Sequence, residues 1–60
     1  MPVIQVHCRP KTIEQRRRAL AEIATAAANA LDVDPALVQV FITEYDDDHW
    51  TKGAIAARPA

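Results

Sequence analysis

The sequence predicts an α/β fold: a single β-α-β unit followed by a short C-terminal hairpin. Three observations lead to this prediction. A segment rich in β-branched residues stands near the start, a long alanine-rich segment without glycine or proline follows, and a second β-branched segment comes next. Two strands joined by a helix of matching length favour a right-handed parallel crossover. At 60 residues, the sequence predicts one domain over residues 1–60.

Residues 3–8 form the first predicted strand. Alternate side chains would face opposite sides of the sheet, with Ile4, Val6 and Cys8 together on one side. The segment Arg9-Pro10-Lys11 should end the strand, because proline cannot donate a hydrogen bond to a strand ladder.

The helix is predicted over residues 13–31. Thr12 and Gln15 have the spacing of a capping box, in which each side chain accepts from the other residue's backbone amide. Alanine, the best helix former, recurs along the segment. We expect Arg16–Arg18 on a solvated face. The apolar residues fall close to one stripe that would face the sheet: Ile13, Leu20, Ile23, Ala24, Ala27 and Leu31.

The second strand is predicted over residues 37–43, after a break at Asp32–Pro35. Val40 and Ile42 would face one way and Phe41 the other, so both faces carry apolar side chains. This pattern indicates burial on both sides, with the helix covering one face and a partner subunit covering the other.

The tail, residues 45–60, opens with Asp46–Asp48, which we expect to be a solvated acidic turn. A short hairpin is predicted around Trp50–Ala56. His7, Cys8 and His49 do not fit a recognised metal-ligand spacing with these carboxylates, so we predict no metal site.

Size and composition limit the partners. A domain this small buries only about 60% of its unfolded surface. The single cysteine, Cys8, excludes an intrachain disulfide, so we expect a homo-oligomer. The net charge of −1 argues against nucleic acid. No apolar run is long enough for a membrane span, and the N-terminus does not have the pattern of a signal peptide. A lone free thiol favours a cytoplasmic location.

Taken together, five short motifs resemble the 4-oxalocrotonate tautomerase family over nearly the whole chain. They are Met1-Pro2 directly before a strand, Gln5-Val6-His7, Glu14-Gln15 at the helix start, Ile42-Thr43-Glu44, and His49-Trp50 before Gly53. The resemblance implies protomers that pair into a four-stranded sheet and assemble as a hexamer, a trimer of dimers. It also implies an isomerase, a keto-enol tautomerase that needs no cofactor and acts on small enol or keto acids.

The resemblance further implies that Pro2 is the catalytic base once Met1 has been removed. An N-terminal proline is a secondary amine, and an α-amino group ordinarily has a pKa of about 7.7–8.0. Burial and neighbouring cations lower such a pKa toward the working pH, where a base is efficient. While Met1 is attached, the Pro2 nitrogen is an amide without useful basicity. The structural alternative is that Pro2 merely begins a strand.

At the implied substrate-binding positions the chain departs from the best-known family members. Lys11 stands at the position of a carboxylate-binding arginine, and Arg9 matches an arginine of some dehalogenase relatives. Gln39 replaces a second arginine, so it offers a hydrogen-bond donor without a charge. Trp50 replaces a phenylalanine wall and adds an N–H donor. The structural alternatives are solvated cations at Arg9 and Lys11, and interface packing by Trp50.

Other functions stay open. A dehalogenase or hydratase of the same superfamily, acting on unsaturated (halo)acids, would need a carboxylate such as Glu44 or one of Asp46–Asp48 to activate water. Loss of charge at Gln39 also fits a catalytically weakened tautomerase-like oligomer. A ribbon-helix-helix DNA-binding protein is disfavoured, because residues 38–43 are strand-like and residues 3–8 contain no lysine or arginine.

Overall fold

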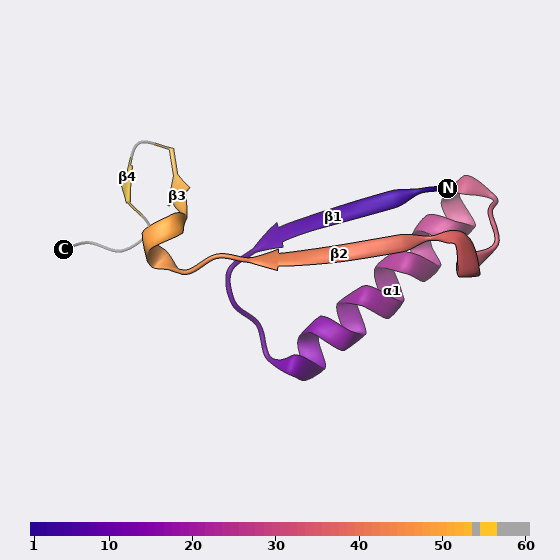
Figure 1. The fold of residues 1–60 in the computed structure, drawn as a ribbon, viewed down its shortest axis with the longest axis horizontal. Helices are drawn as coiled ribbons and strands as arrows, with labels where there is room; N and C mark the ends of the chain where they lie inside the picture. Colours follow the sequence, from indigo (N-terminus) through magenta and orange to yellow (C-terminus); the bar gives the residue numbers. More distant parts are fainter. Residues whose placement is uncertain (54, 57–60) are drawn as a thin grey trace.

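The computed structural model describes residues 1–53 and 55–56, and it contains the predicted β-α-β unit. Strands β1 (Val3–Cys8) and β2 (Gln39–Glu44) pair in parallel, in a register that runs from Val3 opposite Gln39 to Cys8 opposite Glu44. Helix α1 (Ile13–Leu31) connects them and lies along one side of the sheet (Figure 1). The predicted bounds of the first strand and the helix are confirmed.

The second strand begins two residues later than predicted and ends one residue later. Pro35–Leu37 forms a 3-10 helix, η1, rather than the start of a strand. Asp34 caps this turn, since its carboxylate accepts a hydrogen bond from the Ala36 amide at 2.9 Å. Proline is well suited to the first position of such a turn, because an amide hydrogen at that position would have no partner within the turn.

Helix α1 starts and stops through the signals in its sequence. The predicted capping box is present: the Thr12 hydroxyl accepts from the Gln15 amide at 3.1 Å, and the Gln15 side chain accepts from the Thr12 amide at 3.0 Å. The helix ends at Asp32, whose φ of 55° places it in the left-handed region. This geometry turns the chain back toward η1.

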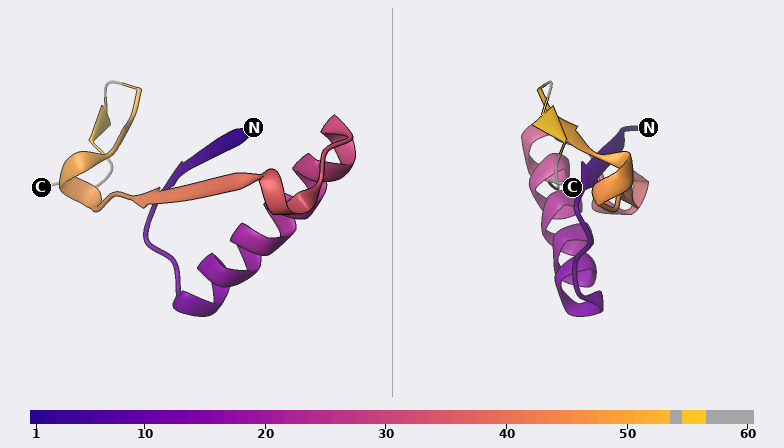
Figure 2. Two further views of the ribbon diagram at one scale, coloured as in Figure 1. Left: turned by 45° about the vertical axis from the view of Figure 1, so that its right-hand side comes forward. Right: turned by 90° about the vertical axis from the view of Figure 1, so that its left-hand side faces the viewer.

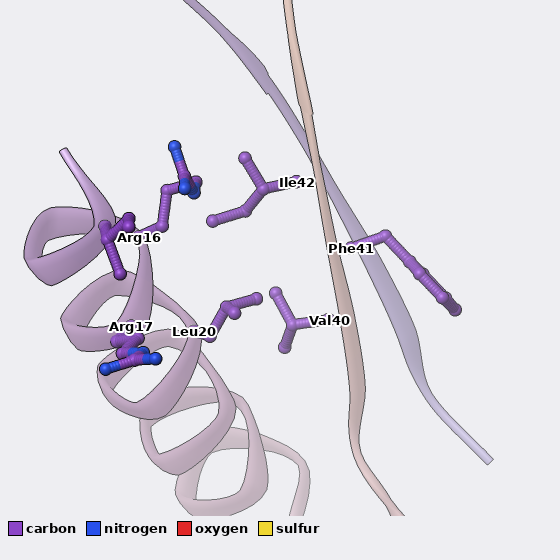
Figure 3. Close-up of a pocket in the computed structure, with 7 residues that line it drawn as sticks. Arg16, Arg17, Leu20, Val40, Phe41 and Ile42 are labelled. Carbon is purple, nitrogen blue, oxygen red and sulfur yellow. The ribbon is translucent and has the colours of Figure 1, made fainter. Parts of the chain in front are cut away.

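The core lies between α1 and β2. Figure 3 shows Val40 and Ile42 pointing toward Leu20, while Phe41 points away from the helix. An open groove remains between the two elements, lined by Ile13, Arg16, Arg17, Leu20, Val40, Phe41 and Ile42. Among the residues whose burial is described, Ala28 alone is fully buried.

The predicted apolar stripe of α1 is only partly buried. Its central residues are half-buried, but Ile13 and Leu31 at its two ends are each 56% exposed, contrary to the prediction. The reason is length. A helix of 19 residues spans about 28 Å, whereas a six-residue strand spans about 20 Å, so the helix overhangs the sheet.

Arg16 does not lie on a solvated face as predicted. Its guanidinium group is half-buried and donates to both carboxylate oxygens of Glu44, at 3.2 and 3.3 Å, and to the Lys11 carbonyl at 2.9 Å. Glu44 also accepts from the Lys11 amide at 2.8 Å. The Lys11 amide is the main cause of a lowered pKa of Glu44, which burial opposes and Arg16 reinforces. These contacts fasten the end of β2 to the start of α1.

The predicted hairpin is also present. After a 3-10 helix, η2 (Asp47–His49), strands β3 (Thr51–Lys52) and β4 (Ile55–Ala56) pair antiparallel. Gly53 occupies the turn with φ of 71°, a conformation that favours glycine. The hairpin stands beyond the end of the β1–β2 sheet in Figure 1 and in the left-hand view of Figure 2.

The sheet face opposite α1 is open in the single chain. It carries the exposed side chains of Val3 and Phe41, 51% and 53% accessible. The radius of gyration is 14.5 Å, against about 10 Å for a compact domain of this length. The accessible surface is 4890 Å², about 1,000 Å² more than a compact monomer of this mass has. The single chain therefore exposes more surface than a compact monomer of its size.

We predict that Glu44→Gln lowers the thermal unfolding midpoint at neutral pH, because it removes the charge that Lys11 and Arg16 stabilise. A carboxyl whose folded-state pKa is lowered stabilises the fold above its unfolded pKa and loses that effect as pH falls through the folded pKa. The difference in unfolding midpoint between the wild type and the variant should therefore become smaller in acid. Circular dichroism melts at neutral and acidic pH measure it.

The control for this experiment is Glu22→Gln, which alters an exposed pair with Arg18 and should change the midpoint little. A Glu44→Gln protein that melts with the wild type at neutral pH, or a gap that persists in acid, would contradict the prediction.

We predict that Phe41→Asp breaks the proposed assembly into smaller units with fewer chains. Burying an unpaired carboxylate in an apolar interface costs several kcal/mol, and each 1.4 kcal/mol weakens association about tenfold. Native mass spectrometry reports the number of chains. Asn29→Asp, a carboxylate at an exposed position of α1, is the matched control and should leave the assembly intact. An unchanged chain count in Phe41→Asp would show that the open face is not an interface.

Candidate functional site

The residues singled out from the sequence fall at opposite ends of the sheet. Pro2 and Gln39 lie at the end where both strands begin, because the Gln39 amide donates to the Pro2 carbonyl at 3.0 Å. Arg9 and Lys11 follow the other end of β1, and Trp50 follows the other end of β2. A six-residue strand separates the two groups by about 20 Å. One chain therefore does not bring Pro2 together with the predicted carboxylate-binding residues.

At the first end, Pro2 is half-buried and Met1 is 81% exposed. The Met1 sulfur accepts a hydrogen bond from the Gln39 side-chain amide at 3.2 Å. Met1 thus has two effects here. It makes the Pro2 nitrogen an amide, and it engages the side-chain donor of Gln39.

At the second end, Arg9 forms an ion pair with Asp47. Its side chain is 39% exposed and that of Asp47 is 21% exposed, so neither is fully solvated. Within the part of the chain that is described, the Arg9 Nε atom is buried without a hydrogen-bond partner. The expectation of a solvated turn at Asp46–Asp48 is therefore wrong at Asp47, because the positive charge of Arg9 draws that carboxylate against β1.

Lys11 is held by its backbone. Its amide donates to Glu44 and its carbonyl accepts from Arg16, while the residue as a whole is exposed. The loop that carries Lys11 is thus fixed to the end of β2, and the ammonium group extends from a defined backbone position.

Trp50 is half-buried and lies against Tyr45, with ring centroids 5.7 Å apart and planes tilted by 42°. The Tyr45 hydroxyl is 2.7 Å from Nδ1 of His7, and the two rings are stacked with centroids 5.7 Å apart. The sequence analysis did not single out Tyr45. The contact follows from the strand register, which the sequence alone does not give: His7 lies opposite Thr43, and Tyr45 is the next residue on the same side of the chain.

The acidic residues of the tail serve its local structure. Asp46 caps η2, since its carboxylate accepts from the Asp48 and His49 amides at 3.0 and 3.1 Å. Its pKa is lowered chiefly by the hydrogen bond from the His49 side chain, against a smaller opposing effect of burial. In residues 1–53 and 55–56, no three histidine, cysteine or acidic residues gather as metal ligands would. No helix within the same residues combines the length and apolar character needed to cross a membrane.

The sequence matches the model of the tautomerase enzyme family over residues 2–54. Solved structures agree. A 4-oxalocrotonate tautomerase (4-OT) isozyme from Methylibium petroleiphilum is 35% identical with a TM-score of 0.87, over 93% of this chain and 89% of that chain. A heterohexamer 4-OT from Chloroflexus aurantiacus J-10-fl is 32% identical with a TM-score of 0.88, over 93% and 92%.

A third structure, an apo unfused 4-OT, is 28% identical with a TM-score of 0.90 over 95% of each chain. No curated protein matches the sequence. The family model covers most of the chain, and the fold of the 4-OT structures covers nearly all of it. This chain therefore belongs to the tautomerase family.

Proposed function

We propose that the protein is a cofactor-independent isomerase that tautomerises small enol or keto acids, with the Pro2 amine as general base after removal of Met1. The observation that carries this proposal is the position of Pro2. It is half-buried at the start of β1 and is fixed there by the backbone hydrogen bond from Gln39. A secondary amine held in this way has a defined lone-pair direction, because the proline ring cannot rotate.

Removal of Met1 would prepare the site in two ways. It would convert the Pro2 nitrogen from an amide into a basic amine, and it would release the Gln39 side-chain amide from the Met1 sulfur. The released amide would then donate to the carbonyl oxygen on which negative charge develops during enolisation. Base and donor would thus become available in a single processing step.

The complete site would form between protomers. Pro2 and Gln39 lie about 20 Å from the end of the sheet that carries Arg9, Lys11 and Trp50, so a small acid cannot reach both groups in one chain. A second protomer that brings its opposite end to Pro2 would complete the site. The open apolar face supports such an assembly, for which we propose the hexamer of paired dimers. One relative in the family is described as a heterohexamer.

In this composite site, Arg9 and Lys11 bind the substrate carboxylate and Trp50 forms an apolar wall. Arg9 is paired with Asp47, so a substrate carboxylate would replace one negative partner by another. Because Gln39 is neutral, the Pro2 end offers no second cation. This arrangement favours an acid with one carboxylate, such as the enol of phenylpyruvate, over a dicarboxylate.

Three of the four carboxylates that a dehalogenase or hydratase could use are engaged in other contacts. Glu44 accepts from Lys11 and Arg16, Asp46 caps η2, and Asp47 pairs with Arg9. These contacts support tautomerisation over water activation. For the location we propose the cytoplasm, where the lone thiol of Cys8 would stay reduced.

We predict that Pro2→Ala lowers kcat on enol phenylpyruvate by about 100-fold, because a rotating primary amine replaces the fixed secondary amine. Intact mass spectrometry must first show that Met1 is absent from both proteins. Pro35→Ala, which changes a proline of η1, is the matched control and should retain activity. Equal rates for wild type and Pro2→Ala would remove Pro2 from the mechanism.

We predict that Gln39→Arg moves the acidic limb of the kcat/KM profile to lower pH. A cation beside the Pro2 amine disfavours its protonated form, so the base stays available in more acidic solution. The added charge should also raise kcat by about tenfold. Gln39→Leu, which removes the donor without adding charge, is the comparison. Gln39→Leu should lower kcat without moving the acidic limb of the kcat/KM profile to lower pH. An acidic limb that stays in place in Gln39→Arg would mean that the base is not adjacent to residue 39.

A further inference from the structure

Tyr45 stands where the sheet passes into the tail. Its backbone amide donates to the Cys8 carbonyl at 2.9 Å, so the pairing with β1 continues one residue past the end of β2. The backbone of Tyr45 is therefore fixed to β1, and the tail departs from a defined point.

The ring of Tyr45 is fixed as well. Its hydroxyl is hydrogen-bonded to Nδ1 of His7 at 2.7 Å, and the two rings stack with an interplanar angle of 25°. His7 is part of β1, where successive side chains have alternating, defined directions. A directional bond and a stacking contact to a strand residue together restrict both torsion angles of the tyrosine side chain.

The segment after Tyr45 returns Trp50 to this ring. Asp46 caps the single turn of η2 through two backbone amides, and Asp47 pairs with Arg9. Trp50 follows the turn and contacts Tyr45 at a centroid distance of 5.7 Å. The direction of the indole thus depends on a chain of contacts that runs from β1 through His7 and Tyr45.

We propose that Tyr45, oriented by His7, is a positioning residue that fixes the Trp50 indole and so sets the affinity for acids with an aromatic substituent. The inference rests on the proposed function, in which Trp50 is a wall of the substrate pocket. Tyr45 acts only through Trp50, so its loss should weaken binding of an aryl acid and leave proton transfer at Pro2 unaffected.

The composition of the chain allows a direct test, because Trp50 is the single tryptophan. In Tyr45→Leu, quenching of Trp50 fluorescence by acrylamide should increase, since the indole loses its covering ring. The dissociation constant of phenylpyruvate, measured by titration of the same fluorescence, should rise about tenfold. On the enol substrate, KM should rise to match while kcat changes by less than about twofold.

Tyr45→Phe keeps the ring and removes only the hydroxyl bonded to His7, so it should raise the dissociation constant by about threefold. If Tyr45→Leu fails to fold, this variant carries the comparison alone. Glu22→Gln, on the exposed side of α1, is the control and should match the wild type in every measurement. Native mass spectrometry confirms that all variants have the same number of chains.

Two results would overturn the proposal: unchanged acrylamide quenching in both Tyr45 variants, or increased quenching with an unchanged dissociation constant. Failure of the wild type to bind phenylpyruvate would also overturn it. The titrations are repeated in the Pro2→Ala protein, because binding to that variant can be measured without turnover of the ligand. If Pro2→Ala turns over substrate at the wild-type rate while Tyr45→Leu still weakens binding, the base assignment fails and the positioning role stands.

Discussion

The parallel pairing of β1 with β2 is the constraint on which the rest of the structure depends. Parallel strands begin at the same end of a sheet, so Pro2 and Gln39 are neighbours, and the residues that follow the strands gather at the other end. The same pairing leaves a sheet with one covering helix and an open face. The proposed association with further copies would both complete the pocket and cover the open face of the sheet. Stability and catalysis should therefore be lost together when the proposed assembly is broken.

The far end of the sheet is organised by two networks on opposite faces. On the helix side, Glu44 binds the Lys11 backbone and the Arg16 side chain, which fixes the loop before α1. On the open side, Tyr45 binds His7 and supports Trp50. Glu44, the last residue of β2, and Tyr45, which follows it, thus shape the two sides of a single proposed pocket, because successive side chains of an extended chain alternate. A shift of the β1–β2 register by one residue would exchange the two roles and disrupt both.

The sequence predicted the local elements well and the long-range contacts poorly, for a physical reason. The first strand and the helix have unambiguous local signals: β-branched alternation, a capping box at Thr12 and an uninterrupted alanine-rich run. The predicted start of the second strand, residue 37, is too early. Leu37 continues directly into the apolar run of the strand, so the sequence pattern does not show that Leu37 belongs to the turn capped by Asp34. The partners of Arg16 and Tyr45 lie 28 and 38 residues away, so no local pattern reveals them. Two features of the proposed site could be found only from the structure. The strand register places Gln39 beside Pro2, and the three-dimensional arrangement separates both residues from Arg9.

The neutrality of Gln39 has a consequence for the proposed base. With glutamine at this position, a Pro2 amine would keep a higher pKa than it would beside an arginine, so a smaller fraction would be free base at neutral pH. Each free amine is, however, a stronger base. The remaining cations, Arg9 and Lys11, lie at the other end of the sheet and would come from another protomer. They would act on the substrate carboxylate rather than on the amine. In the proposed assembly, the residues that bind the carboxylate and the residue that acts as base are therefore contributed by separate chains.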